Sequence, residues 1–319
     1  MSLRILVTGA SGFVGGSFLR RFQEQPGVEI HGIGRRASDL PNYHRIDLSQ
    51  PFALPWQPDV VIHAAALASP WGTRAQFQRH NVQATANVID FCKRHGCPRL
   101  LYVSSSSVFY REAHQYDLSE DSPIGPAFVN TYAQTKYLGE TLLQHYPGDT
   151  CVLRPRAVFG PGDTVLFPRV IAAARKGALP RFVGQTQPVI GDLIYIDTLC
   201  DYLYRAATAP QLQPAYNLTN AQPVDLQQLL LDLLTRLQLP LPRREVRIAT
   251  ALRMASVVEA AYRVLRLRGE PPITRFGVGA FAYSKTFDPR RTLADLGPPS
   301  VSLEQGIEAF VRWQAAQWA

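Results

Sequence analysis

A tyrosine and a lysine stand four residues apart in the segment "NTYAQTKYLGE", at Tyr132 and Lys136. The segment has helical periodicity, and residues four apart on a helix lie on one face. A tyrosine with an unperturbed pKa of about 10 is a poor base at neutral pH, but a neighbouring ammonium group favours the phenolate and lowers that pKa. The pair is therefore suited to exchanging a proton with a substrate alcohol or carbonyl.

A run of four serines supplies further hydroxyl groups. The segment "SSSSVFY", from Ser104 to Tyr110, directly follows the apolar run Leu100–Val103. A serine at the end of a buried strand can share a hydrogen bond with the substrate oxygen that the tyrosine serves. Each feature alone has an ordinary explanation, because serine-rich loops and surface tyrosines beside solvated lysines are common. Together they predict a site that moves a proton at a carbon–oxygen bond.

Glycines near the N-terminus predict a phosphate site. The segment "VTGASGFVGG" places Gly9, Gly12 and Gly15 between an apolar run and a helix-like stretch. Glycines allow a tight turn, and the N-terminus of a helix offers free N–H groups to a phosphate. The spacing is GxxGxxG, not the GxGxxG of the dinucleotide fingerprint, so a plain turn is the alternative for the motif by itself. After the first strand of an α/β chain, it predicts a dinucleotide that supplies the hydride.

The second apolar run indicates which dinucleotide binds. It ends in "IHGIGRR", with Gly34 where an acidic residue would bind the ribose 2′-OH of NAD. Arg35 and Arg36 follow, and guanidinium groups suit a 2′-phosphate. We therefore predict NADP(H) as the preferred cofactor; NAD(H) is the alternative if the arginines only solvate the surface. Asp47, in "IDL", is expected near the adenine amine.

The elements that position these residues alternate between apolar runs and helical stretches. Strands are predicted at Arg4–Thr8, Val28–Ile33, Asp59–Ala65, Arg99–Ser104 and Thr150–Arg154, and helices at Val14–Gln25, Ala75–Arg94 and Asn130–His145. This pattern predicts a doubly wound α/β fold with a parallel sheet (Rossmann) and a smaller, irregular C-terminal substrate lobe. Residues 1–160 are assigned to the dinucleotide-binding domain, with 189–220 returning to it, and residues 161–319 mainly to the substrate-binding lobe.

Composition sets the broad class of the protein. Of 319 residues, 46% are hydrophobic and 18% charged, as in soluble globular proteins. Four cysteines without a CxxC pair and seven histidines without ligand spacing predict reduced thiols and no metal site. Neither a membrane-spanning run nor a signal peptide is evident, which favours a cytoplasmic protein. The net charge of +8 is local, with seven arginines in Arg243–Arg268, and no nucleic-acid-binding module accompanies it.

With these motifs in place, the chain resembles the extended short-chain dehydrogenases/reductases, the NAD-dependent epimerase/dehydratase group, over nearly its whole length. The family's TGxxGxxG turn matches Thr8–Gly15, its HxAA pattern matches His63–Ala66, and its serine motif matches Ser104–Tyr110, with Tyr110 replacing the usual glycine. The resemblance implies that Ser105, Tyr132 and Lys136 are catalytic and that Ser104 is a backbone contact to the nicotinamide. The cofactor-binding residues assigned in all are Gly9, Ser11, Gly12, Phe13, Val14, Gly15, Arg35, Arg36, Asp47, Leu48, Ala64, Ala65, Ala66, Asn81, Ser104, Pro155 and Val158.

The C-terminal stretch Gly269–Gly297 resembles the 3β-hydroxysteroid dehydrogenase-like branch, which includes reductases of 2-alkyl-3-ketoalkanoic acids. Ser106 and Ser107 stand where 4,6-dehydratases carry Asp and Glu, which argues against dehydration. We predict an NADP(H)-dependent oxidoreductase that interconverts a secondary alcohol and a ketone on an apolar, steroid- or lipid-like substrate. The alternatives are a nucleotide-sugar epimerase or reductase, with basic residues such as Arg169, Arg175 or Arg181 on the diphosphate, and a non-catalytic NADP-binding sensor.

Two surfaces are predicted to meet partners. Leu252, Val258, Tyr262 and Leu265 can share one face of the basic helix at Ile248–Arg268. That helix is either an ordinary core-facing helix or a lid in weak contact with an anionic membrane surface. Many relatives in the family pair through two long helices, which implies Ala75–Arg94 and Asn130–His145 as the surface of a homodimer, with a monomer as the alternative.

Overall fold

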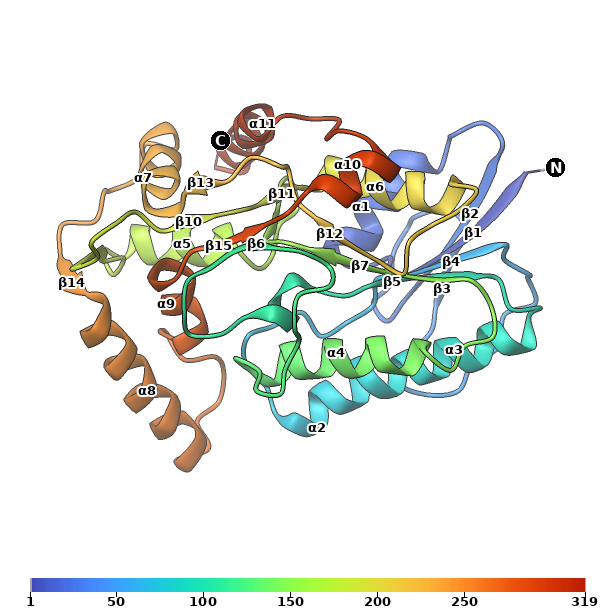
Figure 1. Ribbon diagram of the computed structural model, residues 1–319, viewed down its shortest axis with the longest axis horizontal. Helices are drawn as coiled ribbons and strands as arrows, with labels where there is room; N and C mark the ends of the chain where they lie inside the picture. Colours follow the sequence, from blue (N-terminus) through green and yellow to red (C-terminus); the bar gives the residue numbers. More distant parts are fainter. Residues whose placement is uncertain (1, 319) are drawn as a thin grey trace.

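The computed structural model describes residues 2–318 and has a seven-stranded parallel sheet at its centre (Figure 1). The order across the sheet is β12-β7-β5-β4-β1-β2-β3, so the chain winds outward from β1 in both directions. This confirms the predicted doubly wound α/β fold. The strands are β1 (Leu3–Thr8), β2 (Val28–Gly34), β3 (Tyr43–Arg45), β4 (Val60–His63), β5 (Arg99–Val103), β7 (Thr150–Pro155) and β12 (Ala215–Leu218).

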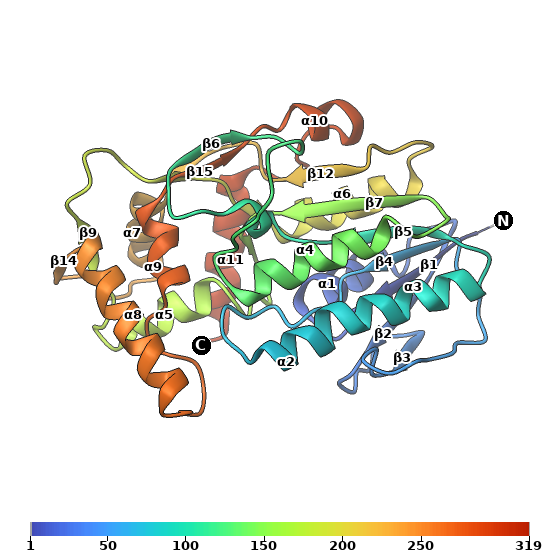
Figure 2. The ribbon, with the colours of Figure 1, turned by 60° about the horizontal axis from the view of Figure 1, so that its bottom comes forward.

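Helices cover both faces of this sheet. On one face lie α1 (Phe13–Phe22) and α6 (Ile196–Thr208), and on the other α2 (Arg74–Phe77), α3 (Ala84–Arg94) and α4 (Thr131–Leu143) (Figures 1 and 2). Side chains alternate along a strand, so Val60 and Ile62 pack in the α1/α6 core while Val61 packs against α3. The homodimer predicted to use α3 and α4, which lie side by side, stays a prediction.

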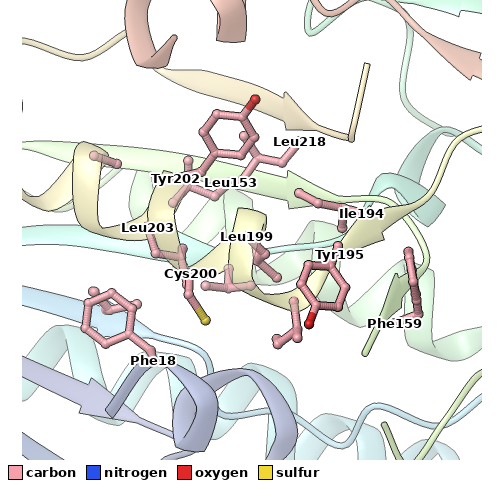
Figure 3. Close-up of a cluster of buried hydrophobic side chains, with 14 of the residues drawn as sticks. Phe18, Leu153, Phe159, Ile194, Tyr195, Leu199, Cys200, Tyr202, Leu203 and Leu218 are labelled. Atoms are coloured by element: carbon pink, nitrogen blue, oxygen red, sulfur yellow. The ribbon is translucent and has the colours of Figure 1, made fainter. Parts of the chain in front are cut away.

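The segment Val189–Ala207, predicted as a strand followed by a helix, folds as two short strands before α6. These are β10 (Ile190–Gly191) and β11 (Ile194–Tyr195). Figure 3 shows Leu199 and Leu203 of α6 in one buried cluster with Phe18 of α1 and Leu153 of β7. All four of these side chains have no exposed surface, so α6 is anchored to the central sheet.

Most of the remaining elements form short sheets and helices beyond the carboxyl ends of the central strands, whereas α10 packs against β12 and α6. One small sheet has the order β13-β10-β15-β6, and its β6 and β15 join segments about 170 residues apart. None of these short pairings was predicted, and the domain boundaries stay a prediction. The elements are η2 (Ser106–Phe109), β6 (Gln115–Leu118), β8 (Val158–Phe159), α5 (Phe167–Arg175), β9 (Arg181–Val183), β13 (Val224–Asp225), α7 (Leu226–Arg236), β14 (Glu245–Arg247), α8 (Ile248–Val264), α9 (Arg275–Ala282), β15 (Lys285–Phe287), α10 (Arg290–Leu296) and α11 (Leu303–Ala316).

The basic helix α8 departs from its predicted packing. It ends at Val264, and Leu265 is 66% exposed, so Leu265 does not belong to the inward face. The residues that α8 buries are instead Ala251, Ala255 and Glu259. Leu252 packs against the same cluster as Ala251 and Ala255, whereas Met254, Val257 and Val264 are exposed. Within residues 2–318 no helix combines the length and hydropathy needed to cross a bilayer.

His63, at the end of β4, is a fully buried imidazole that links three elements. Its Nδ1 lies 2.7 Å from Thr8 Oγ1 on β1, and its Nε2 lies 3.0 Å from Thr85 Oγ1 on α3. Thr85 donates its own proton to the Asn81 carbonyl at 2.5 Å, so Nε2 donates to Thr85 and Nδ1 accepts from Thr8. Burial lowers the pKa of His63 to about 3, with a smaller contribution from Lys136. The folded protein therefore holds a neutral imidazole here.

This burial predicts a dependence of stability on pH. Below the unfolded-state pKa of about 6.5, the unfolded chain takes up a proton that folded His63 excludes until about pH 3. Stability is thus present above pH 6.5 and is lost as the pH falls. Urea unfolding of the cofactor-free protein should show a steeper loss below about pH 6 in the wild type than in His63→Gln, by up to about 1.4 kcal/mol per pH unit.

The control for this experiment is His145→Gln, which alters an exposed imidazole at the end of the α4 region. In that variant the free energy of unfolding should depend on pH as it does in the wild type. Parallel pH curves for the wild type and His63→Gln would show that His63 does not carry this effect.

Candidate active site

The loops that follow β1, β4, β5 and β7 meet at one edge of the sheet, because these strands are parallel neighbours. They carry the glycine turn, Ala64–Ala66, the serine run and the segment from Pro155 to Val158. Together with the second lobe they enclose a cavity of about 1130 Å³. Open α/β sheets bind their ligands at this edge.

The cavity brings together the predicted site residues with one exception. The predicted residues that line it are Gly9, Ser11, Gly12, Phe13, Val14, Gly15, Arg35, Arg36, Asp47, Leu48, Ala64, Ala65, Ala66, Ser104, Ser105, Tyr132, Lys136, Pro155 and Val158. Asn81, grouped with the cofactor-binding residues, is buried behind the lining.

Asn81 lies in a π-helical turn, η1 (Gln78–Gln83), which interrupts the single helix predicted for Ala75–Arg94. Its Oδ1 accepts a hydrogen bond of 2.7 Å from the backbone N–H of Leu67. Its Nδ2 donates to Thr135 Oγ1 on α4 at 3.0 Å. Asn81 therefore ties the loop after β4 to the helix that carries Tyr132 and Lys136, and positions both.

The glycine turn has no room for side chains. Gly9 has φ +73°, and a Cβ there would lie 2.8 Å from the backbone nitrogen of Ala65. A Cβ on Gly15 would lie 2.6 Å from the carbonyl oxygen of Gly9. The N-terminus of α1 has Gly12 as its N-cap and no side chain that caps it. Its backbone N–H groups are therefore available to a phosphate.

The end of β2 is crowded around Gly34. A Cβ on Gly34 would lie 2.5 Å from both Ser11 Oγ and Tyr43 Oη, so a larger residue requires these two side chains to move. Arg35 and Arg36 follow at the rim of the cavity, and Arg36 donates a hydrogen bond to the Ser11 carbonyl in the glycine turn. The Oδ2 atom of Asp47 lies 3.6 Å from Nη2 of Arg79. Two guanidinium groups, of Arg35 and Arg36, thus line the same cavity as Asp47.

Each serine of the run has its own partner. Ser104 Oγ donates to Glu140 Oε1 at 2.5 Å, while Ser106 Oγ lies 3.2 Å from Tyr110 Oη. Ser105 Oγ lies 2.9 Å from Ser107 Oγ and accepts from the Ser107 backbone N–H. Because the Ser104 side chain is taken up by Glu140, its backbone is the part that remains to contact a cofactor.

Tyr132 lies in the first turn of α4, and Ser105 is close enough to affect its pKa. Burial raises the pKa of Tyr132 to about 12, and Ser105 opposes that rise. That Lys136 lowers this pKa stays a prediction. In the protein without cofactor, the side chains that shift the pKa of Tyr132 are Ser105 and Tyr110.

Lys136 is buried and bonded to the end of β5. Only 2% of the residue is exposed, and its Nζ donates to the Val103 carbonyl at 2.5 Å, over the ring of Tyr102. Burial lowers the pKa of Lys136 to about 7, although Glu140 one turn along α4 raises it. At neutral pH the lysine is therefore only partly protonated, and its charge is directed at the end of β5.

Glu140, one turn along α4 from Lys136, forms a buried ion pair with Arg154. Arg154 on β7 donates to Glu140 from Nε at 3.1 Å and from Nη2 at 2.8 Å, and both side chains are less than a tenth exposed. Such a pair is costly to break from one side, because it leaves a charge without a partner. Glu140 thus connects Arg154, Ser104 and the charge of Lys136.

Sequence reasoning missed three residues that line the cavity near Ser106: Tyr110, Arg156 and Lys285. Tyr110 was noted only as a replacement of a family glycine. Arg156 stands two residues after Arg154 in "LRPRAVFG", with nothing to mark it as inward-facing. Lys285 comes from β15, about 130 residues further along. No local pattern in the sequence brings these residues together.

The residues present fit a nicotinamide dinucleotide. The glycine turn leaves space for a pyrophosphate at an uncapped helix, and the Ser105–Tyr132 hydroxyls stand at the other end of the same lining. Arg35 and Arg36 border the part between the glycine turn and Asp47.

Comparison with known proteins agrees with this geometry. Residues 5–220 match the model of the NAD dependent epimerase/dehydratase family. The chain is 32% identical to a 2-alkyl-3-oxoalkanoate reductase of Stenotrophomonas maltophilia, over 98% of this chain and all of that protein. It is 31% identical to 3beta-hydroxysteroid-dehydrogenase/decarboxylase isoform 1 of Arabidopsis thaliana, over 79% of this chain and 61% of that protein. These relatives confirm the resemblance to the 3β-hydroxysteroid dehydrogenase-like branch.

Solved structures share the fold at low sequence identity. The Bordetella bronchiseptica enzyme WbmH in complex with NAD+ superposes over all of both chains with a TM-score of 0.76 and 20% identity. RMD from Pseudomonas aeruginosa, complexed with NADPH, covers 99% of this chain with a TM-score of 0.71 and 21% identity, and is itself fully covered. The chain thus belongs to the NAD dependent epimerase/dehydratase family and is an NAD(P)-dependent enzyme of the extended short-chain dehydrogenase/reductase type.

Proposed function

We propose that the protein is an NADP(H)-dependent reductase that interconverts a ketone and a secondary alcohol on an apolar, lipid- or steroid-like substrate. The observation that carries this proposal is that Ser105 and Tyr132 lie close together in the wall of one cavity, which the uncapped glycine turn also lines. The names of the relatives, a 2-alkyl-3-oxoalkanoate reductase and a 3beta-hydroxysteroid-dehydrogenase/decarboxylase, support the same reaction on apolar ketones.

Tyr132 and Ser105 have different roles at the substrate oxygen. Tyr132 exchanges the proton and Ser105 donates a hydrogen bond that steadies the oxygen. Lys136 is bonded to the end of β5, where it can contact a ribose hydroxyl and, when protonated, favour the phenolate of Tyr132. A bound nicotinamide supplies or accepts the hydride. A non-catalytic sensor would not need this set of three side chains.

The wall of the second lobe favours an apolar substrate over a nucleotide sugar. Apolar residues that line it include Val129, Val246, Met254, Ile273, Phe276 and Phe281. The arginines expected to hold a sugar diphosphate have other partners: Arg169, in the cavity lining, pairs with Glu270 at 2.7 Å, and Arg175 lies over the ring of Trp318 at 4.0 Å. Arg181 lies 3.9 Å from Glu245 and does not line the cavity.

Removal of the Tyr132 hydroxyl tests the proposal. We expect Tyr132→Phe to lose about 100-fold or more of the turnover of an apolar ketone, because general acid catalysis is lost. Affinity for NADPH, followed by its fluorescence, should change by less than about 2-fold, since the ring remains. The matched control is Tyr137→Phe, on the same helix but packed against Phe128.

The substrate panel for this test combines 2-alkyl-3-oxoalkanoate esters and 3-ketosteroids with UDP-sugars, and the absorbance of NADPH reports turnover. Turnover of UDP-sugars alone, or full activity of Tyr132→Phe on a ketone, would refute the proposed function.

The preference for NADP(H) is proposed from Arg35 and Arg36 together with Gly34, which stands where an acid would bind the 2′-OH of NAD. The double variant Arg35→Ala/Arg36→Ala should weaken NADPH binding by about 10-fold or more, because charge-assisted contacts to the 2′-phosphate are lost. NADH binding, which lacks that phosphate, is the internal control and should change little. Tighter binding of NADH than of NADPH by the wild type would contradict the preference.

Apolar side chains on α8 support a weak contact with an anionic membrane. Met254, Val257, Val264 and Leu265 are between 53% and 79% exposed, and the helix projects at the edge of the molecule (Figure 1). Exposed arginines flank them, and Met254 also lines the cavity. Such a helix suits the interface of a bilayer with negative headgroups, beside an entrance for apolar substrate.

Vesicle co-sedimentation tests this contact. The wild type should pellet with phosphatidylserine-containing vesicles but not with phosphatidylcholine alone, and Arg253→Glu/Arg266→Glu should stay in the supernatant. The control Lys93→Glu/Arg312→Glu makes the same change of charge on α3 and α11 and should pellet like the wild type. No retention of the wild type on anionic vesicles would dispose of the contact.

A further inference from the structure

Two buried cations line the substrate part of the cavity. Arg156 follows the end of β7 and Lys285 begins β15, and both belong to the cavity lining. Only 8% of Arg156 and 4% of Lys285 is exposed. Arginine and lysine are almost never buried to this degree without a partner of opposite charge.

Among residues 2–318 neither side chain has an ion-pair partner. The Nε of Arg156 is buried and has no hydrogen-bond partner. Lys285 Nζ donates only to backbone carbonyls, those of Ala113 and Ser284. The neighbouring cavity arginines differ, because Arg275 pairs with Glu112 and Arg169 with Glu270. Positive charge is therefore uncompensated at this place in the cavity.

One carboxyl group lies close by, that of Asp192, but it does not line the cavity. Burial raises the pKa of Asp192 to about 6, although Arg156 and a backbone N–H from Phe287 oppose the rise. Its Oδ2 accepts that N–H at 2.9 Å, whereas its Oδ1 has no partner. One carboxyl group can balance only one of the two cations, which leaves the pair short of one negative charge on the cavity side.

The two cations share a neighbour that also reaches the catalytic group. Arg156 Cζ lies 5.0 Å and Lys285 Nζ 5.8 Å from the ring centre of Tyr110. The Tyr110 hydroxyl lies 3.2 Å from Ser106 Oγ, next to Ser105 in the chain. Tyr110 is also close enough to Tyr132 to contribute to the rise of its pKa. The cations thus lie one aromatic ring away from the site of proton exchange.

We propose that Arg156 and Lys285 form a carboxylate-binding subsite, so that the substrate is an apolar ketone or alcohol that carries a carboxylate group near the reacting carbon. This inference rests on the proposed reductase function and specifies its substrate class. Arginine offers two parallel donors to a carboxylate, and lysine adds a point charge. A neutral analogue leaves both buried cations unpaired, so the subsite also rejects neutral substrates.

The test compares a medium-chain 2-alkyl-3-hydroxyalkanoate with its methyl ester, each oxidised with NADP+. The acid and ester differ in the charge of one group while keeping the reacting alcohol. In the wild type, kcat/KM for the acid should exceed that for the ester by about 10-fold or more. In Arg156→Gln and in Lys285→Gln, kcat/KM for the acid should fall about 10- to 100-fold, while that for the ester changes by less than about 3-fold.

Controls separate recognition from damage to the fold. Arg156→Lys keeps the charge and should recover part of the activity on the acid. Arg312→Gln removes an arginine whose side chain is 72% exposed on α11 and should behave as the wild type on both substrates. NADPH fluorescence should report the same cofactor affinity for every variant, which shows that each one is folded.

A binding measurement distinguishes this inference from the proposed function. Calorimetric titration of NADP+-loaded protein with a medium-chain alkanoate should show binding that Arg156→Gln and Lys285→Gln weaken about 10-fold or more, and no comparable binding of the methyl ester. Equal turnover of acid and ester by the wild type, or equal losses on both in the variants, overturns the subsite and leaves the reductase. Alkanoate binding that depends on Arg156, with no turnover of any ketone or alcohol, supports the subsite and overturns the reductase.

Discussion

The carboxyl ends of β1 and β4 approach each other so closely that no side chain fits between them. A Cβ on Gly9 would lie 2.8 Å from Ala65 N and 2.9 Å from Ala64 O, while Thr8 accepts the Ala65 N–H and bonds to buried His63. This contact places the glycine turn against the loop after β4 and sets where α1 begins. Because β5 and β7 are the next strands on that side, the serines and Pro155 reach the same edge.

Burial shifts the pKa values of the ionisable side chains that line the cavity. Tyr132 has a raised pKa, and Lys136 and Lys285 have lowered ones, with burial the largest cause in each case. The protein holds Lys136 beside the Glu140–Arg154 pair, whereas Arg156 and Lys285 have no such partner in the described chain. A site of this kind is arranged for ligands that restore the missing charges. Cofactor and substrate would therefore change the protonation of the residues that act on them.

The sequence allowed most of the central sheet and its helices to be predicted, because their apolar patterns are local. Even the alternation of Val60, Val61 and Ile62 between two cores follows from strand geometry. The short strands could not be predicted: β6 and β15 have four and three residues and are stabilised by a pairing across about 170 residues. The inward face of α8 was predicted with Leu265, but the helix ends before it and buries Ala251 and Ala255 instead. Small buried residues carry little hydrophobic pattern, so the side that faces the core was not evident.

By itself, the sequence determined which chemistry the chain can perform. Tyr132 and Lys136 must share a face of α4 because an α-helix has 3.6 residues per turn, and the spacing of Gly9, Gly12 and Gly15 requires a turn that admits a phosphate. Only the tertiary structure decided how far those groups are charged, since the loss of water around a side chain depends on everything that packs against it. Only the tertiary structure, likewise, brought Arg156 and Lys285 to one tyrosine ring, because Arg156 follows a strand of the central sheet and Lys285 belongs to a different sheet, far apart in the chain.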